Sequence, residues 1–323
     1  MRSAAEQLVT LRAQIRAAEE RAGRSPDSCA LLAVSKGVSA ERVAEVIDAG
    51  QRRFGENRVQ ELEEKRAAVA LLRPKVETHW ELIGPLQSNK LRRALAVADR
   101  ITSVDRMDLL VKLVGASKDA SGVISIALQV NSDEDPAKAG FAPAELREAL
   151  PEVAELLRGT SVVIDGLMMI GRLTDDQAEA RRSVAAFASY ATALRAAAAE
   201  AGLAIGPLLS AGMSGDFEVA IEEGATQVRL GSALFGARGE PFFMGFTPLL
   251  AIDLILQTLW FVVLARVLVS WVDRSGTGRV SRILIDMSEP ILGPVRRILP
   301  ATAGIDFSPI VVMILLQFLR RLL

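Results

Sequence analysis

Some kinds of chemistry are excluded by residues that this chain of 323 amino acids largely lacks. Cys29 is its only cysteine, so the chain holds no intrachain disulfide and no cluster of thiolate metal ligands. Cys29 lies in the apolar run CALLAVS, which predicts a buried small side chain rather than a reactive thiol. The net charge is only −1 and neither part of the chain is strongly basic, so we expect no nucleic-acid partner.

A secretory signal is also missing at the N-terminus. The first residues, MRSAAEQLVTLRAQIRAAEERAG, place Leu8, Leu11 and Ile15 on one face of a predicted amphipathic helix. They contain neither an apolar core nor a cleavage site of the kind that a signal peptide needs. We therefore expect the water-soluble part of the chain to lie in the cytoplasm.

Long apolar runs appear only after residue 240. Up to about Gly239, short apolar runs alternate with charged, helix-like stretches. From Pro241 the chain continues as PFFMGFTPLLAIDLILQTLWFVVLARVLVSW, in which Asp253 and Arg266 are the only charges. We therefore predict two domains, a soluble one at residues 1–239 and a membrane one at residues 240–323.

The pattern of the first domain predicts an α/β fold. Eight apolar runs read as strands, with amphipathic segments between them, at 29–35, 52–55, 79–83, 100–104, 123–130, 162–169, 207–211 and 226–230. Eight such units in this length fit a single (β/α)₈ TIM-type barrel. An open doubly wound sheet is the alternative. It usually has a glycine-rich turn after its first strand, where this chain has Ser35-Lys36-Gly37.

Lys36 is the first candidate functional residue, because it follows the first predicted strand and active sites of barrels lie at the carboxyl ends of strands. It could be a solvated lysine whose stem covers apolar surface. It could also be a Schiff-base lysine, since apolar surroundings lower the pKa of an amine enough for it to attack an aldehyde.

Two small-residue turns favour the second interpretation. The segment 210–216, SAGMSGD, follows the seventh predicted strand, and Arg229-Leu230-Gly231-Ser232 follows the eighth. Barrels commonly bind phosphate at these two loops, where glycine permits close approach of the backbone and Ser214 and Ser232 add hydroxyl donors. A lysine after the first predicted strand, combined with these two turns, is stronger evidence for the Schiff-base interpretation than any of these features alone.

The motifs that surround these residues resemble a known family. LLAVSKG, FGENRVQE, LIGPLQSNK, GLM and GMSGDFEVAIEEGATQVRLGSALFGAR stand in order between residues 31 and 238. They are similar to the YggS/PROSC family of pyridoxal 5′-phosphate (PLP) homeostasis proteins, which are single barrels of the alanine racemase N-terminal type. The resemblance implies an intracellular protein that serves vitamin B6 homeostasis and binds PLP.

The resemblance also assigns roles to individual residues. Lys36 would hold PLP as a Schiff base, and Asn57 of the GEN motif would lie at the cofactor face. Ser214, Gly231 and Ser232 would bind the phosphate, while Arg229 would face the pyridine nitrogen. No metal is implied.

One departure from the family concerns the residues before IGPLQSNK, where the family often has Trp-His. This chain has Trp80-Glu81, and its only histidine is His79. The resemblance therefore does not carry over any reaction that depends on that histidine, and for His79 we predict packing or a hydrogen bond at the rim.

Catalytic turnover is not expected from these residues. Alanine racemase takes a tyrosine base from a second domain, whereas the only tyrosine here, Tyr190, lies within the predicted helix 175–201. An arginine opposite the ring nitrogen also weakens the cofactor as an electron sink. We therefore expect a PLP carrier whose partners are PLP-dependent enzymes that lack their cofactor. The alternatives are a racemase or lyase with a partner-supplied base, and a membrane-associated PLP sensor.

The second domain resembles the YggT family of small membrane proteins through RVLVSW, EPILGPVRRILP and GIDFSPIVVMILLQFL. We predict an α-helical membrane hairpin with apolar spans near 249–271 and 307–323, which contacts the lipid bilayer through residues 249–323. The segment 274–300 between them is expected to lie on the bilayer surface. Arg266 falls within the first span and either pairs with Asp306 or snorkels to the interface near Trp271.

Overall fold

The computed structural model describes residues 3–118, 122–171, 176–236, 248–272, 278–298, 306 and 308–322. The chain divides into two compact units, Met1–Pro241 and Phe242–Leu323. The segment around the predicted junction at residue 240 lies outside the described residues.

The first unit is a closed barrel of parallel strands that pair in chain order, with the last strand pairing with the first. The strands are β1 (Ala30–Val34), β2 (Arg53–Glu56), β3 (His79–Leu82), β4 (Arg100–Val104), β5 (Ile124–Val130), β6 (Val162–Met169), β7 (Ile205–Ser210) and β8 (Gln227–Leu230). The predicted α/β barrel is confirmed, and each predicted strand overlaps an observed one. Uninterrupted apolar runs such as Leu31–Val34 suit this fold because the strands are covered on both faces.

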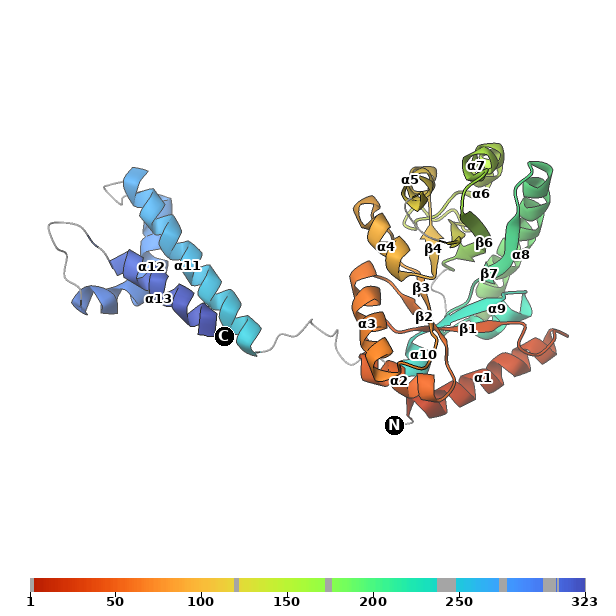
Figure 1. Ribbon diagram of the computed structural model, residues 1–323, viewed down its shortest axis with the longest axis horizontal. Coiled ribbons are helices and arrows are strands. Elements are labelled where there is room, and N and C mark those ends of the chain that lie inside the picture. Colours follow the sequence, from red (N-terminus) through yellow and green to blue (C-terminus); the bar gives the residue numbers. More distant parts are fainter. Residues whose placement is uncertain are drawn as a thin grey trace. The chain divides into compact units, whose positions relative to one another are not determined.

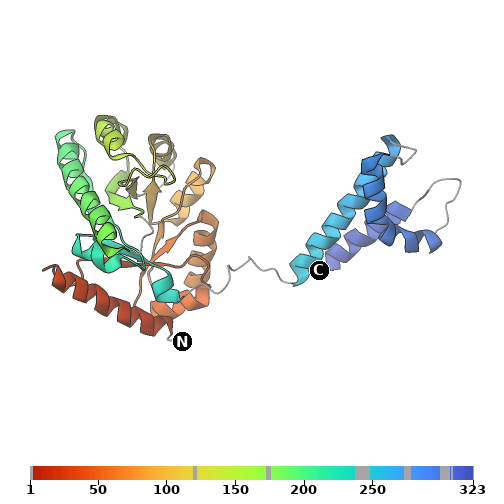
Figure 2. The same ribbon diagram turned by 180° about the vertical axis from the view of Figure 1, so that it is seen from behind.

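Helices surround the ring of strands (Figures 1 and 2). They are α1 (Ala4–Arg21), α2 (Ala40–Asp48), α3 (Val59–Leu72), α4 (Leu91–Val97), α5 (Met107–Ser117), α6 (Pro143–Glu148), α7 (Leu150–Leu157), α8 (Gln177–Glu200), α9 (Phe217–Glu222) and α10 (Ser232–Phe235), and a 3₁₀ turn η1 (Ser88–Lys90) precedes α4. The amphipathic segment between β5 and β6 forms two helices, α6 and α7. Pro151 has no N–H to donate to the carbonyl of Arg147, so the helix is interrupted between them.

The core of the barrel joins the strands to the inner faces of the helices. Leu8, Leu11 and Ile15 of α1 are buried in it, which confirms the predicted amphipathic helix. Phe54 of β2 and Trp80 of β3 are fully buried and stack with ring centroids 5.0 Å apart. Burying side chains of this size stabilises the fold by roughly 2–3 kcal/mol each, and they fix the two strands whose ends carry part of the candidate site.

The second unit consists, in its described residues, of α11 (Pro248–Val272), α12 (Arg279–Ile298) and α13 (Ser308–Leu322), and each of these helices packs against the other two. Val263, Leu292, Val312 and Leu316 form its buried core. The predicted spans coincide with α11 and α13, apart from Phe307 and Leu323, which lie outside the described residues. Among the described residues, no helix is both long enough and apolar enough to cross a membrane.

Of the two alternatives for Arg266, the pairing with Asp306 is wrong. The guanidinium of Arg266 donates to Ser288 Oγ at 2.7 Å and to Glu289 Oε2 at 3.0 Å. Asp306 instead accepts from Arg296 Nε at 2.8 Å, and Arg296 also contacts Glu289. The reason is that α12 packs against α11 and brings its own carboxylate to Arg266.

Candidate functional site

The residues singled out from the sequence follow four neighbouring strands of the barrel. Lys36 follows β1, Asn57 follows β2, Ser214 follows β7, and Gly231 follows β8. Strand β1 pairs with both β2 and β8, and β8 pairs with β7. Because parallel strands end at one rim, the topology brings these residues to one continuous arc at the end where barrels place their active sites.

The turn that carries Lys36 is held on both sides by carboxylates. Ser35 is fully buried, and its hydroxyl donates to Glu56 Oε1 at 2.7 Å. The backbone N–H of Gly37 donates to Glu61 Oε1 at 2.5 Å. Lys36 itself is half-buried between these two anchored neighbours. Its backbone is therefore set by contacts from β2 and α3.

Lys65 of α3 forms hydrogen bonds with both carboxylates and with the backbone of Ser35. Its ammonium donates to Glu56 Oε1 at 2.6 Å, to the carbonyl of Ser35 at 2.5 Å and to Glu61 Oε1 at 3.0 Å. Burial raises the pKa of Glu56 to about 7, although Lys65 and Ser35 oppose that rise. Burial also acts to raise the pKa of Glu61, but the N–H of Gly37 and the charge of Lys65 outweigh it and lower that pKa.

The loops after β7 and β8 meet through their hydroxyls. Ser232 Oγ donates to Ser214 Oγ at 3.1 Å, and the backbone N–H of Ala233 donates to the same oxygen at 3.2 Å. A Cβ at Gly212, whose φ is +90°, would lie 2.6 Å from the Cβ of Ala220. Only glycine therefore fits where α9 packs against the end of β7, and this packing places the loop that holds Ser214.

Arg229 projects from β8 into the interior and is only 6% exposed. Its guanidinium donates to the carbonyl and the hydroxyl of Ser210, both at 2.9 Å, and to the carbonyl of Met169 at 2.7 Å. A guanidinium has five N–H donors, so these contacts leave two donors for a ligand. Burial lowers the pKa of Arg229 to about 10, while the charges of Asp216 and Glu81 act to raise it.

Asn57 is half-buried at the end of β2, and Gly84 places it. A Cβ added to Gly84 would lie 2.3 Å from the carbonyl oxygen of Asn57 and 2.7 Å from its Cα. The two backbones therefore touch directly, and any side chain at position 84 would displace Asn57. This contact links the IGPLQSNK motif after β3 to the GEN motif after β2.

Other residues considered from the sequence lie away from this chemistry. The hydroxyl of Tyr190 donates to the carbonyl of Pro143 at 2.9 Å. Cys29 is buried, and burial raises the pKa of its thiol to about 12, as expected of an unreactive residue. Nε2 of His79 lies 3.4 Å from Glu81 Oε1, and its Nδ1 lies 3.9 Å from Asp99 Oδ2.

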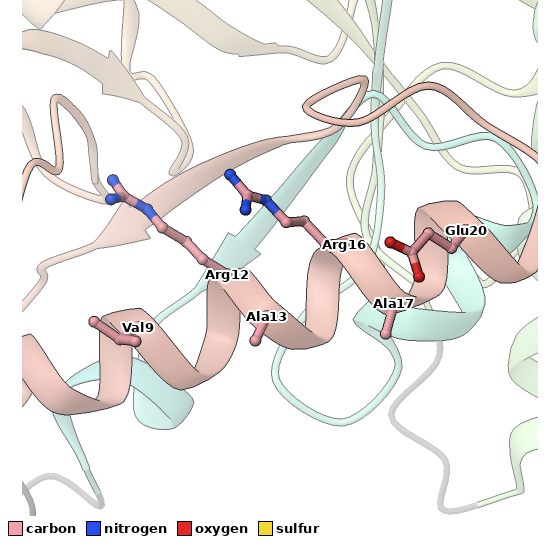
Figure 3. A pocket seen from close by; sticks show the side chains of 6 residues that line it. All are labelled: Val9, Arg12, Ala13, Arg16, Ala17 and Glu20. Atoms are coloured by element: carbon pink, nitrogen blue, oxygen red, sulfur yellow. The ribbon is translucent and has the colours of Figure 1, made fainter.

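A surface depression of about 440 Å³ lies on α1 (Figure 3). Its lining comes from one helix alone and consists of Val9, Arg12, Ala13, Arg16, Ala17 and Glu20. Arg12 already donates to the carbonyls of Ala49 and Gly50, at 3.3 and 2.9 Å. No residue of a strand-end loop takes part, so we assign this depression no role in the site.

Comparison with known proteins defines the class of the barrel first. Residues 7–239 match the family described as alanine racemase, N-terminal domain. Residues 247–323 match the CCB3/YggT family. The fold of the first unit also resembles alanine racemase from Streptomyces lavendulae, at 21% identity and a TM-score of 0.54, over 72% of this chain and 58% of that one.

More similar relatives identify the family. The pyridoxal phosphate homeostasis protein of Pseudomonas aeruginosa is 40% identical over 239 residues, which cover 74% of this chain and 97% of that protein. The protein of the same description from Escherichia coli K12 is 38% identical over 242 residues, which cover 74% and 98%. The chain belongs to the pyridoxal phosphate homeostasis protein family.

A solved structure of one relative contains the cofactor. PipY of Synechococcus elongatus, determined with PLP bound, is 38% identical to this chain. The match covers 72% of this chain and 100% of PipY, with a TM-score of 0.62. The relatives named above match the barrel unit.

Proposed function

We propose that the barrel binds PLP for intracellular vitamin B6 homeostasis, with Lys36 holding the cofactor as a Schiff base. The observation that carries the proposal is the convergence of four strand ends, with Lys36, Asn57, Arg229 and the Ser214–Ser232 pair on one arc of the rim. The family relationship and the PLP-bound relative support it.

The donors present fit the chemistry of PLP. Ser214 and Ser232 bring two hydroxyls together beside Gly231, which has no side chain to keep a phosphate from the backbone. Arg229 keeps two N–H donors for the ring nitrogen, which accepts a hydrogen bond when it is unprotonated. Asn57 would contact the cofactor from the β2 side.

The proposed role is to hold and deliver PLP rather than to catalyse turnover. Bound PLP supplies an aldehyde carbon that amines attack and a ring that withdraws electrons. Arg229 opposes protonation of that ring. The hydroxyl of Tyr190, the only tyrosine, is bonded to Pro143 on the helical layer and so supplies no base at the rim. PLP-dependent enzymes without cofactor are the proposed recipients.

We further propose that the second unit associates the protein with a membrane and that the barrel lies in the cytoplasm. The match to the CCB3/YggT family supports this. So does the outer surface of α13, where Ile310, Ile314 and Leu315 are about half exposed or more. The full chain is expected to sediment with membranes after cell lysis, and a chain that ends at residue 241 to remain in the supernatant. Equal distribution of the two would contradict this part of the proposal.

Absorbance spectroscopy with PLP tests the proposed cofactor role. The full chain in detergent should develop the imine band near the visible edge when PLP is added, and Lys36→Ala should not. Persistence of the band in Lys36→Ala would remove Lys36 from its role.

Incubation with L-alanine or L-serine should yield no D-isomer above the Lys36→Ala control. Clear turnover above that control would contradict the proposed carrier role.

A further inference from the structure

Behind the proposed cofactor site, a chain of buried polar side chains crosses the barrel interior. Glu81 Oε1 accepts from Gln227 Nε2 at 2.9 Å. The other end of the Gln227 amide accepts from Ser210 Oγ at 2.8 Å, and Ser210 Oγ accepts from Arg229 at 2.9 Å. Glu81, Gln227 and Ser210 are fully buried. An unbroken path thus connects a carboxylate to the guanidinium of Arg229.

The chemistry at the two ends sets the direction of every bond in this path. A guanidinium can only donate and a carboxylate can only accept. The hydroxyl of Ser210 must therefore accept a hydrogen bond from Arg229 and donate one to the amide oxygen of Gln227, whose N–H in turn donates to Glu81. Linked bonds with one direction polarise one another and strengthen, above all between charged ends.

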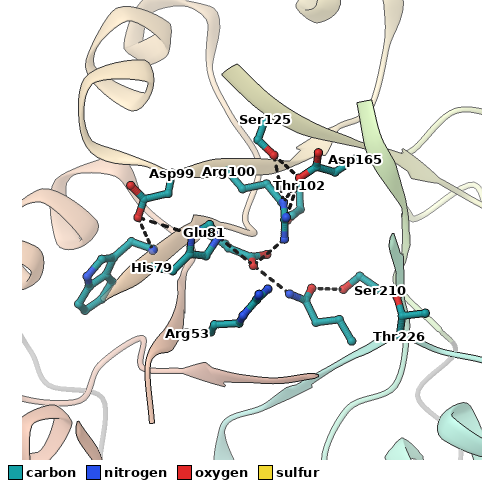
Figure 4. A network of polar contacts seen from close by, with 12 residues as sticks. Arg53, His79, Glu81, Asp99, Arg100, Thr102, Ser125, Asp165, Ser210 and Thr226 are labelled. Atoms are coloured by element: carbon teal, nitrogen blue, oxygen red, sulfur yellow. Dashed lines mark hydrogen bonds and ion pairs between the residues drawn. The ribbon is translucent and has the colours of Figure 1, made fainter. Parts of the chain in front are cut away.

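Glu81, at the end of the path away from Arg229, is itself held by an arginine. Arg100 donates to Glu81 Oε1 at 3.0 Å and pairs with Asp165 at 2.6 Å (Figure 4). The second oxygen of Glu81, Oε2, is buried without a hydrogen-bond partner among the described residues. A buried oxygen of this kind destabilises a fold. Packing alone therefore does not account for a carboxylate at this position.

We propose that Glu81 is a positioning residue for Arg229, and that it acts through Gln227 and Ser210 to aim the guanidinium at the cofactor ring. The inference rests on the proposed function, since it takes Arg229 as the residue that faces the pyridine nitrogen. It concerns a position at which this chain departs from the Trp-His that its family often has. Asp216 is the other carboxylate whose charge acts on Arg229, from the loop after β7.

A comparison of two ligands isolates this role. The probes are PLP and 1-deaza-PLP, which carries C–H in place of the ring nitrogen and so cannot accept from Arg229. For each variant of the full chain in detergent, the ratio of the two dissociation constants measures the contact with the ring nitrogen. The wild type should prefer PLP by roughly ten-fold, which corresponds to one charged hydrogen bond. Arg229→Leu should lower the ratio to about one.

Glu81→Gln removes the charge while it keeps the shape, and Ser210→Ala cuts the path without touching Glu81. In both variants, the logarithm of the ratio of the two dissociation constants should fall at least half-way from its wild-type value to its value in Arg229→Leu. Asp99→Asn is the matched control, because this carboxylate lies beside His79 but outside the path (Figure 4), and it should retain the wild-type ratio. If Glu81→Gln does not fold, Ser210→Ala carries the test.

The outcomes separate the inference from the function on which it rests. A wild-type ratio in both Glu81→Gln and Ser210→Ala, beside a ratio of one in Arg229→Leu, would overturn the positioning role. A ratio near one in the wild type would also overturn it, because Arg229 would then make no contact with the ring nitrogen. Failure of the wild type to bind either probe would instead contradict the proposed function.

Discussion

The ammonium of Lys65 lies 2.6 Å from Glu56 Oε1, and both side chains are buried beside the turn that carries Lys36. Neither residue belongs to the predicted set of cofactor contacts. Together with Glu61 they hold both neighbours of Lys36 by hydrogen bonds. The position of the proposed Schiff-base lysine thus depends on a buried ion pair.

At pH 8, above the pKa of Glu56, Lys65→Met should destabilise the barrel by about 3 kcal/mol, because breaking a buried pair leaves the charge of Glu56 without compensation. Denaturant unfolding measures this. Lys112→Met is the control, since Lys112 forms an exposed pair with Asp108 whose loss should cost about 0.5 kcal/mol or less. PLP occupancy at equal cofactor concentration should fall only in Lys65→Met. Equal effects of the two substitutions would contradict the role assigned to the buried pair.

The pKa of Glu56 predicts a dependence of stability on pH. Because the folded state raises this pKa to about 7, from 4.5, it binds the proton more tightly than the unfolded chain does. The resulting stabilisation is complete below about pH 4.5 and is lost as the pH rises through 7. Glu56→Gln has no such proton. The free energy of unfolding of the wild type, relative to Glu56→Gln, should therefore fall by about 1–3 kcal/mol between about pH 5 and pH 8. A difference that stays constant or rises with pH would contradict the assignment.

Gly84→Ala tests the contact that places Asn57. The added Cβ would lie 2.3 Å from the carbonyl oxygen of Asn57, so the end of β2 must move. We expect a loss of about 1–3 kcal/mol in stability and weaker binding of PLP. Gly115→Ala is the matched control, because nothing lies within 4 Å of its added Cβ in helix α5. That substitution should stabilise the protein by about 0.5–1 kcal/mol and leave PLP affinity unchanged. Wild-type affinity in Gly84→Ala would show that Asn57 is not held by this contact.

In the second unit, Glu289 is the carboxylate between Arg266 and Arg296. Glu289→Ala should lower the stability of the packing between α11 and α12 by about 1 kcal/mol, since these partly exposed pairs are screened. Thermal unfolding of the full chain in detergent, followed by circular dichroism, measures the change. Asp286→Ala, at an exposed position on the same helix, should have little effect. A larger loss in Asp286→Ala would mean that α12 is held differently.

Lys36 and the two turns that hold Ser214, Gly231 and Ser232 could be predicted from the pattern, since barrel strands are short apolar runs and the residues after them share one rim, whereas Asn57 and the role of Arg229 are implied by the family resemblance alone. Lys36, Asn57, Ser214, Arg229, Gly231 and Ser232 follow or end such strands in the structure. The pair Glu61–Lys65 also has a sequence signal, a spacing of four on the helix 59–72. That Glu56 joins them depends on the register of β1 against β2, which no local pattern reveals.

The interior path and the contacts of Arg266 could not be predicted for a different reason. Gln227 and Glu81 are 146 residues apart in the chain and meet only because the barrel closes. Asp306 directly precedes the second predicted span and carries the charge that could pair with Arg266, but the packing of α12 supplies Glu289 instead. In both cases the partner is selected by tertiary packing, whereas sequence patterns report the faces of single elements.

Borohydride trapping tests the central claim most directly. The full chain is loaded with PLP and reduced with sodium borohydride, which makes a Schiff base permanent, and the peptides are then mapped by mass spectrometry. The added mass should lie on the peptide that contains Lys36, and it should be absent from Lys36→Ala treated in the same way. Label of equal amount on another lysine, in both the wild type and Lys36→Ala, would contradict the assignment of Lys36 as the residue that holds the cofactor.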